Sequence, residues 1–324
     1  MKKLSRRRFC QALGAGAALL ALSGCQEPAS ASSGSVSAAP DSAAPASAAD
    51  PGGDWLLTPA EYPVVDGSTA CIPLMAAMLH ETTGMDLTEA QTSITVSTTG
   101  YAWERMAVYY DPAYSEPMLL VVYEAPDYIQ QEIEAEGTQL EVTPIGLDAL
   151  VFMVNEQNPV QSLTRQQLID IYTGKITNWQ QVGGEDLEIV AFQRSPDSGS
   201  QALFLKLAMD GQTPMEAPTE LAPTEMGELV DQLASYNNAG SAIGFSVYYY
   251  IDQMYSQPGL RLMAVDGVTP SSETIGDGSY PYCNPFYAAI RADTPADSPA
   301  RLLYDWLCSD AGTACVEGAG YVPA

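Results

Sequence analysis

Short runs of β-branched and apolar residues alternate along this chain with longer amphipathic stretches. The expected strands are Ser93–Ser97, Met118–Tyr123, Ala149–Asn155, Glu188–Phe192, Ala242–Val247, Arg261–Val265 and Phe286–Ile290. The expected helices are Ala70–Glu81, Tyr101–Tyr110, Pro126–Glu136, Thr164–Tyr172, Ser200–Met209, Met226–Tyr236 and Pro299–Leu307. Strands separated by helices favour parallel pairing, because each crossover is long enough to hold a helix. The pattern therefore predicts an α/β fold with mostly parallel sheets flanked by helices.

The first 25 residues have the pattern of an export signal. A basic start precedes the short apolar stretch Leu13–Leu22, which is too short to span a bilayer comfortably. Leu22–Cys25 then resembles the lipobox of bacterial lipoproteins. Ser5–Phe9 resembles a twin-arginine motif, and general secretion is the alternative route. We expect a signal peptide at 1–24, a lipid on Cys25, and anchoring to the outer face of the cytoplasmic membrane.

The segment 25–53 is almost entirely alanine, serine, proline, glycine and aspartate after its cysteine. Such a composition cannot bury an apolar core, so we expect a disordered tether. The folded part then runs from about 54 to 324, which is enough for two lobes.

The chain beyond Cys25 is strongly acidic. It holds eight lysines and arginines against 40 acidic residues, a formal charge of −32. This surface repels nucleic acid and anionic lipid head groups, so we expect neither as a partner. The membrane contact would be made by the N-terminal lipid alone.

Four cysteines fall in the folded part: Cys71, Cys283, Cys308 and Cys315. An even number in an exported protein makes disulfides plausible, and four cysteines allow three pairings. Cys308 with Cys315 is an attractive pair, because a helix break between them would fold one back on the other. Small buried thiols are the alternative.

Three junctions share one design, in which an extended stretch leads through Ser, Thr and Gly into a helix. They are Asp66–Thr69, Ser97–Gly100 and Arg194–Ser200. A helix start offers unpaired N–H groups and the positive end of the helix dipole, which together suit an anion. Ordinary helix capping is the alternative for each junction.

Two charged residues sharpen this anion hypothesis. Arg194, at the end of an expected strand, can pair two oxygens of one anion, although a solvated surface arginine is the alternative. Glu124 follows the expected strand Met118–Tyr123. A carboxylate only accepts hydrogen bonds, so it would select an anion that carries a proton, as hydrogen phosphate does. A strand-end glutamate in solvent is the alternative for Glu124.

Several segments resemble one family over about 62–324. They are Pro144–Asn155 with Asn158–Val160, Leu168–Trp179 with Val182–Gly184, Phe192–Gln201, Ala242–Phe245 and Gly320–Pro323. These segments are similar to the phosphate-binding proteins of ABC phosphate transporters, in the type II periplasmic-binding-protein superfamily. Leu168–Trp179 is the most specific of them.

The resemblance implies a two-lobe clamp that closes on its ligand, with chain crossings near 144–149 and 280–286. Lobe one would comprise 54–146 and 284–324, and lobe two 147–283. The family's ligand contacts carry over to Ser68, Thr69, Thr98, Thr99, Glu124, Arg194, Ser198, Gly199 and Ser200. The implied function is an extracytoplasmic, monomeric lipoprotein that captures phosphate and delivers it to an ABC permease, without a cofactor or metal.

The chain departs from the family pattern near Glu124. Better-known members carry aspartate there, and Tyr110–Pro117 lacks the usual Gly-x-x-Asp spacing before the strand. The ligand therefore stays open among phosphate, sulfate, molybdate and an organic phosphate, and the role stays open between uptake and sensing.

An enzyme is a weaker interpretation of the sequence. The single histidine, His80, follows an apolar run, where a packing role is expected, and no Walker-type or zinc-ligand spacing occurs. A surface sensing or adhesion protein would use Tyr248–Tyr250 and Tyr255 as an aromatic patch, but we expect them to pack inside the lobe. The discriminating feature is whether Arg194 and the three junctions meet in one cleft.

Overall fold

The computed structural model describes residues 55–324, except 218–220, 222, 224–225 and 236–238. The expected signal peptide, Cys25 and the tether lie outside the described residues. Within the described part, no helix is both long and apolar enough to cross a bilayer.

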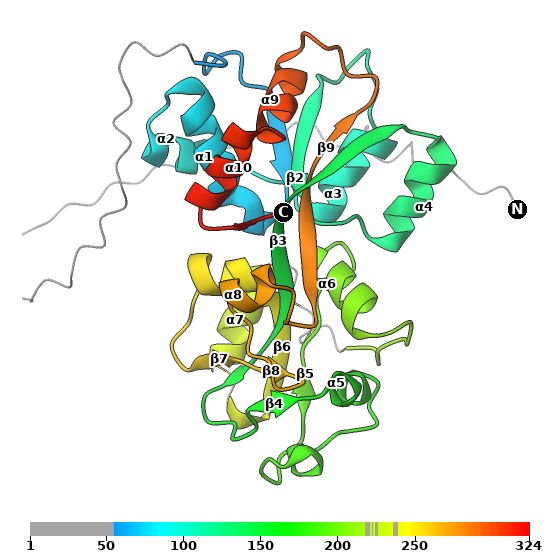
Figure 1. Ribbon diagram of the computed structural model, residues 1–324. Coiled ribbons are helices and arrows are strands. Elements are labelled where there is room, and N and C mark those ends of the chain that lie inside the picture. The colour runs from blue at the N-terminus through cyan, green and yellow to red at the C-terminus, as the bar shows by residue number, and fades with distance from the viewer. Residues whose placement is uncertain (1–54, 218–220, 222, 224–225, 236–238) are drawn as a thin grey trace, which may run out of the picture. The chain divides into compact units, whose positions relative to one another are not determined.

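Two long strands form the centre of the fold (Figure 1). Strand β3 (Leu140–Asn155) and strand β9 (Cys283–Arg291) pair antiparallel from Leu140 opposite Arg291 to Ala149 opposite Cys283. Beyond that point β3 continues without β9 and pairs with strands of the other half of the sheet. These two strands therefore join the two groups of elements that lie above and below their middle.

One eight-stranded sheet holds the remaining pairs in the order β1-β2-β9-β3-β6-β5, with β7 and β10 also on β3. These strands are β1 (Val64–Gly67), β2 (Met118–Val122), β5 (Val190–Ala191), β6 (Ala242–Val247), β7 (Leu260–Leu262) and β10 (Val322–Pro323). Two further strands, β4 (Ser162–Leu163) and β8 (Ala264–Val265), form a separate pair. The pairs β1–β2, β5–β6 and β4–β8 are parallel, whereas all pairs that β3 and β9 make are antiparallel.

Helices cover the sheet in both groups. They are α1 (Ile72–Thr83), α2 (Leu87–Ser93), α3 (Thr99–Trp103), α4 (Asp127–Glu136), α5 (Arg165–Tyr172), α6 (Gly199–Leu203), α7 (Met226–Ser235), α8 (Ser272–Gly276), α9 (Pro299–Leu307) and α10 (Asp310–Gly318). Two of them run directly into π-helical turns, α3 into η3 (Glu104–Val108) and α6 into η5 (Phe204–Ala208). Each of these two therefore belongs to a helical stretch twice its own length.

We call β1, β2, α1–α4, α9 and α10 lobe one, and β4–β8 and α5–α8 lobe two. In Figure 1 lobe one is the upper group and lobe two the lower, with β3 and β9 running between them. The expected lobe boundaries at 146 and 284 fall inside these shared strands, and the residue numbers themselves stay a prediction.

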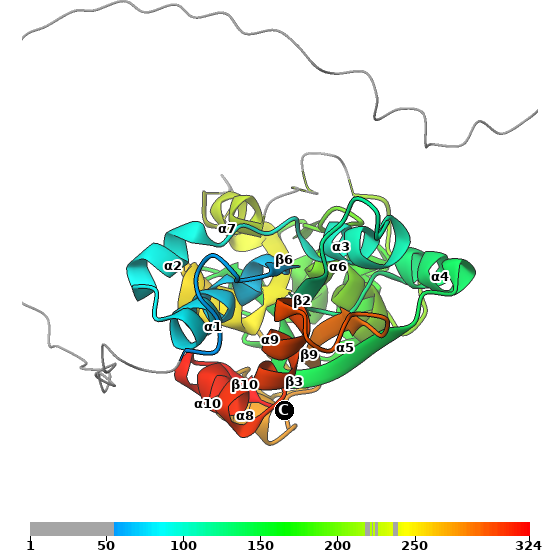
Figure 2. The same ribbon diagram turned by 90° about the horizontal axis from the view of Figure 1, so that it is seen from above.

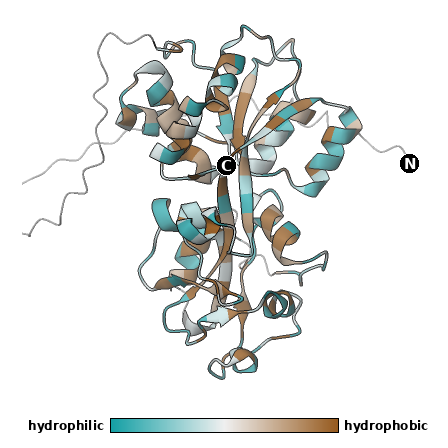
Figure 3. Ribbon diagram, in the orientation of Figure 1, coloured by the Kyte–Doolittle hydropathy of each residue, from teal (hydrophilic) through white to brown (hydrophobic). Residues whose placement is uncertain are grey.

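Apolar packing holds each lobe onto the strands. Phe152 of β3 lies among Tyr172, Phe204 and Phe245 at centroid distances of 6.0–6.4 Å, and Phe204 stacks on Phe245 at 4.3 Å. Figure 3 shows hydrophobic colour along the strands, whereas α4 is largely hydrophilic. The cluster fixes the stretch that begins with α6 against the sheet of lobe two.

One predicted strand is absent. Helix α2 ends at Ser93, and the following residues to Ser97 form no strand. The Asp86 carboxylate caps α2 by accepting from the Thr88 and Glu89 N–H groups at 2.9 and 3.2 Å. Ile94 and Val96 are partly buried against the core without strand pairing. Their alternation reflects this packing and not a place in the sheet.

Candidate anion-binding site

A cleft of about 440 Å³ lies between the two lobes and brings the three junctions together. Its lining residues are Ser68, Thr69, Ser97–Thr99, Tyr101, Tyr123, Arg194, Ser195, Asp197–Ser200 and Met226. Figures 1 and 2 place α3 of lobe one close to α6 of lobe two. The structure therefore brings Arg194 and hydroxyl groups from both lobes to one place.

The first junction follows β1 and positions the Ser68 hydroxyl. A Cβ on Gly67 would lie 1.9 Å from the Val121 carbonyl oxygen, so only glycine allows this close approach to β2. The Ser68 hydroxyl accepts from the Tyr123 N–H at 3.0 Å and lies 2.7 Å from the Thr99 Oγ1. Ser68 and Thr99 are thus adjacent, although 31 residues separate them.

The second junction contains a strained residue. Thr98, immediately before α3, has φ 76° and ψ 164°. This region is essentially restricted to glycine and costs on the order of 1–3 kcal/mol for another residue. Such strain persists only where neighbouring contacts hold it, and here it turns the chain so that the buried Thr99 begins α3 beside Ser68.

The third junction holds a buried guanidinium. Arg194 is only 6 % exposed, and its Nε donates to the Pro223 carbonyl at 3.1 Å. Its Nη1 donates to the Ser200 hydroxyl at 3.4 Å, and Ser200 in turn lies 2.9 Å from the Ser198 hydroxyl. Because a guanidinium stays charged when buried, it supplies a fixed positive charge at the cleft.

The two helical stretches begin against each other. A Cβ on Gly199 would lie 2.4 Å from the Thr99 Oγ1, and the Gly100 N–H donates to the Asp197 carbonyl at 3.3 Å. The positive ends of both helix dipoles therefore point at the same small region. An anion bound there would reduce the repulsion between these two ends.

Glu124 does not line this cleft, contrary to the sequence-based expectation. Its carboxylate forms an ion pair with Lys206 of η5, and the Gln130 side chain donates to it at 3.4 Å. Side chains alternate along extended backbone, so Glu124 points away when its neighbour Tyr123 faces the cleft. In this geometry the Glu124 carboxylate is not available to accept a hydrogen bond from a ligand in the cleft.

Two polar contacts join the lobes beside the cleft. One is the Glu124–Lys206 pair, and in the other the Tyr128 hydroxyl of α4 donates to the Asp197 carboxylate. Burial and this carboxylate raise the pKa of Tyr128, so the hydroxyl remains a donor at neutral pH. Both contacts need the lobes to be close together.

The expected Cys308–Cys315 disulfide is not formed. The four cysteines of the described part are free thiols, with Cys71 and Cys315 buried and Cys308 exposed. Cys308 directly follows the last residue of α9, and α10 begins two residues later, so Cys315 faces the core from a separate helix. Burial raises the thiol pKa of Cys71 and Cys315, which makes both less reactive.

The tyrosines of the alternative surface patch pack against the protein instead. Tyr249 and Tyr250 are buried, and Tyr249 stacks on Tyr321 with ring centroids 3.5 Å apart. His80 is half-buried on α1, with its Nδ1 2.6 Å from the Met85 carbonyl oxygen. Among the described residues, no group of three or more His, Cys, Asp and Glu side chains could hold a metal ion.

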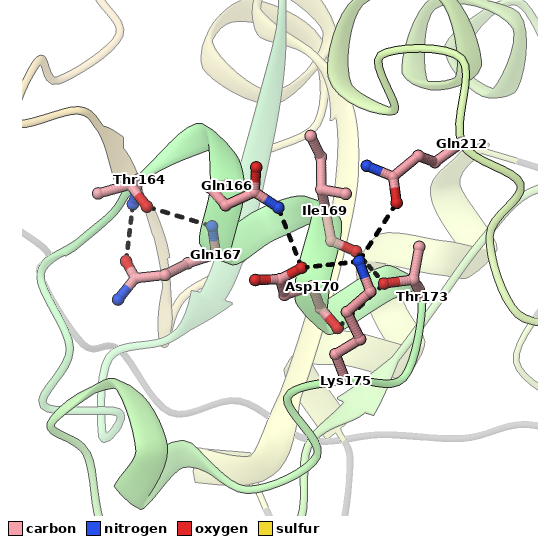
Figure 4. A network of polar contacts seen from close by, with 8 residues as sticks. All are labelled: Thr164, Gln166, Gln167, Ile169, Asp170, Thr173, Lys175 and Gln212. Atoms are coloured by element: carbon pink, nitrogen blue, oxygen red, sulfur yellow. Dashed lines mark hydrogen bonds and ion pairs between the residues drawn. The ribbon is translucent and has the colours of Figure 1, made fainter.

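The segment Leu168–Trp179 plays a structural role away from the cleft (Figure 4). Thr164 and Gln167 form a reciprocal cap at the start of α5, with bonds of 2.8 and 3.1 Å. At its other end the Asp170 carboxylate accepts from the Lys175 ammonium at 3.2 Å. This segment therefore characterises the fold and contributes no group to the cleft.

Comparison with known proteins identifies the family. A family model described as a PBP superfamily domain matches residues 121–311. The chain belongs to the PBP superfamily.

Two solved structures share its two-lobe α/β fold. One is a substrate-binding protein from Clostridium perfringens with bound phosphate, at TM-score 0.61 and 21 % identity, covering 81 % of this chain and 99 % of that one. The other is an ABC-type phosphate transport receptor from Vibrio cholerae, at TM-score 0.56 and 23 % identity, covering 80 % and 98 %.

Two phosphate-binding proteins are similar in sequence to this PBP superfamily chain over part of their length. The phosphate-binding protein PstS of Bacillus subtilis is 28 % identical over 194 residues, which are 59 % of this chain and 61 % of that protein. The PstS of Borreliella burgdorferi is 25 % identical over 201 residues, 60 % of this chain and 69 % of that protein. The matched region thus spans about three fifths to two thirds of these relatives.

Asp148 is a buried group that the sequence pattern did not single out. It lies on β3 opposite Asn284 of β9 and is 2 % exposed. Its carboxylate accepts from the Tyr123 hydroxyl at 2.5 Å, and from the Ala149 and Tyr249 N–H groups at 2.7 and 3.1 Å. Burial outweighs these bonds and raises the pKa of Asp148 to about 6. An aspartate within a long apolar strand is the sequence signal that would have revealed it.

The raised pKa of Asp148 predicts a pH dependence of stability. Between about pH 4 and 6 the folded protein holds a proton that the unfolded chain releases, so this contribution to stability falls as pH rises through that window. Replacing Asp148 with Asn should remove the trend. The free energy of unfolding of the variant minus that of the wild type should rise by about 2 kcal/mol from pH 4.5 to pH 7.

Urea denaturation at both pH values measures this difference. Asp277→Asn is the control, because Ser279 lowers the pKa of Asp277 and the sign of its effect is opposite. Parallel pH profiles of the wild type and Asp148→Asn would contradict the assignment.

Proposed function

We propose that this protein captures inorganic phosphate in the cleft between its lobes and delivers it to an ABC permease. The observation that carries the proposal is the convergence of the buried Arg194 with hydroxyl-bearing junctions of both lobes. The names of the PstS relatives support phosphate as the ligand. The role is binding and delivery, without a chemical reaction.

The ligand contacts would come from both sides of the cleft. Lobe one would supply Ser68, Thr69, Thr98 and Thr99, and lobe two Arg194, Ser198, Gly199 and Ser200. Hydroxyls and backbone N–H groups would donate to the phosphate oxygens, and the guanidinium would balance the charge. Because only the closed arrangement offers both sets, phosphate would stabilise closure of the lobes.

The local charge of the site matters because the whole chain is acidic. A surface with a formal charge of −32 beyond Cys25 repels anions in general. Arg194 and the two helix starts would overcome this repulsion only within the cleft. A phosphate ion would therefore be held by groups fixed in place rather than by a diffuse positive surface.

The same proposal places the protein outside the cytoplasmic membrane. A lipid on Cys25 would hold it at the outer face, and the segment to residue 53 would tether the folded part near its permease. The lobe boundaries at 54–146 with 284–324, and at 147–283, and the monomeric state belong to this proposal.

Replacing Arg194 with Ala should weaken phosphate binding at least about tenfold, because the variant loses the one buried guanidinium that faces the bound anion in this account. Calorimetric titration with phosphate, sulfate and molybdate measures the effect. Arg165→Ala is the matched control, since this lobe-two arginine pairs with Asp266 at the surface, 2.7 Å away. It should bind phosphate like the wild type.

The titrations also decide between ligands. Tight binding of another oxyanion by the wild type would keep the site and change its ligand. Binding that is unchanged in Arg194→Ala would remove this residue from the site. A wild type that binds none of the three anions would contradict the proposed function.

Glu124→Gln should leave phosphate affinity within about threefold of the wild type, because this carboxylate pairs with Lys206 outside the cleft. The variant and the wild type are titrated with phosphate and sulfate. Lys206→Gln breaks the same pair from lobe two and should behave alike. If Glu124→Gln alone lost the preference for phosphate over sulfate, Glu124 would contact the ligand after all.

A further inference from the structure

We propose that Asp66 is the positioning residue of the anion site. Its carboxylate would tie the first two junctions together and so set the spacing of their hydroxyl groups. The inference rests on the proposed function, and it assigns a role to a buried acidic group that has the same sign of charge as the ligand.

The contacts of Asp66 link two distant parts of lobe one. The side chain is 2 % exposed at the end of β1. Its Oδ1 accepts from the N–H groups of Gly67 and Ser97, both at 2.7 Å. Its Oδ2 accepts from the Ser97 hydroxyl at 2.6 Å. One carboxylate thus holds the backbone of both junctions.

The two residues whose N–H groups bond to Asp66 each directly precede a residue of the cleft. Gly67 precedes Ser68, and Ser97 precedes the strained Thr98. The bonds to Ser97 restrain the chain where Thr98 takes its unfavourable conformation. The Ser68 and Thr99 hydroxyls, which lie beyond the tied groups, are then held 2.7 Å apart.

Arg105 makes a carboxylate acceptable beside an anion site. It belongs to the helical stretch that begins at Thr99, and its guanidinium forms an ion pair with the Asp66 Oδ2. Arg105 is 52 % exposed, so its own charge remains partly in water. This ion pair is a second link between the end of β1 and the helical stretch that follows the second junction. It also offsets the charge of Asp66.

Positioning and simple electrostatics predict opposite effects. If Asp66 acted only through its charge, removing it would strengthen anion binding, because a repulsive charge is lost. If Asp66 positions the junctions, removing it weakens binding. Asp66→Asn separates the two, because its amide oxygen can still accept both backbone N–H groups without the charge.

The experiment compares phosphate titrations of the wild type, Asp66→Ala and Asp66→Asn. We expect Asp66→Ala to weaken binding about tenfold or more, and Asp66→Asn to stay within about threefold of the wild type. Equal or tighter binding by Asp66→Ala would overturn the proposal. Should Asp66→Ala not fold, Asp66→Ser replaces it, since its single hydroxyl is too short to bond both Gly67 and Ser97.

Amide hydrogen exchange keeps this test separate from that of the proposed function. A wild type that binds no phosphate, sulfate or molybdate would contradict the function, and exchange at Gly67 and Ser97 would then decide the role of Asp66. Faster exchange at both amides in Asp66→Ala, but not in Asp66→Asn, would support the tie. Exchange unchanged in Asp66→Ala would overturn it.

Discussion

The first residues of α3 and α6 lie against each other. A Cβ at position 199 would come within 2.4 Å of the Thr99 Oγ1, so this contact needs glycine. Two helix dipoles then point their positive ends at one region, next to the buried guanidinium of Arg194. Together these groups suit an anion bound between the lobes. The rest of the structure holds these groups in place, with the aromatic cluster beneath η5 on one side and Asp66 on the other.

The paired strands β3 and β9 connect the two lobes. Among the described residues, these are the two strands of the central sheet that run from one lobe into the other, and Asp148 lies one residue before their pairing ends. Its carboxylate bonds the Tyr123 hydroxyl of lobe one and the Tyr249 N–H of lobe two. A residue of the cleft wall is thereby hydrogen-bonded to a strand that runs between the lobes.

The sequence predicted the elements whose residues pack on one face or are buried on both. Strand β6 and helix α9 have the predicted bounds, and β2 differs by one residue. The three junctions were also identified, because helix starts have a local signature of Ser, Thr and Gly. Their convergence in one cleft depends on long-range pairing that no local pattern reveals.

Other features depended on contacts that the sequence does not show. The direction of Glu124 is set by the register of β2 and by Lys206, which is 82 residues away. The tie between Asp66 and Ser97 joins residues 31 apart, and the second of them was predicted to lie in a strand. The apolar alternation of Ser93–Ser97 resembled a strand because Ile94 and Val96 face the core. Periodicity reports burial, and it cannot distinguish a paired segment from an unpaired one.

The most direct test of the account is a crystal structure of the protein grown with arsenate, a tetrahedral analogue of phosphate whose arsenic atom scatters X-rays anomalously. The account predicts one anomalous peak in the cleft, with arsenate oxygens within hydrogen-bonding distance of the Arg194 guanidinium and of the hydroxyls of Ser68 and Thr99. A peak elsewhere on the molecule with an empty cleft would contradict it.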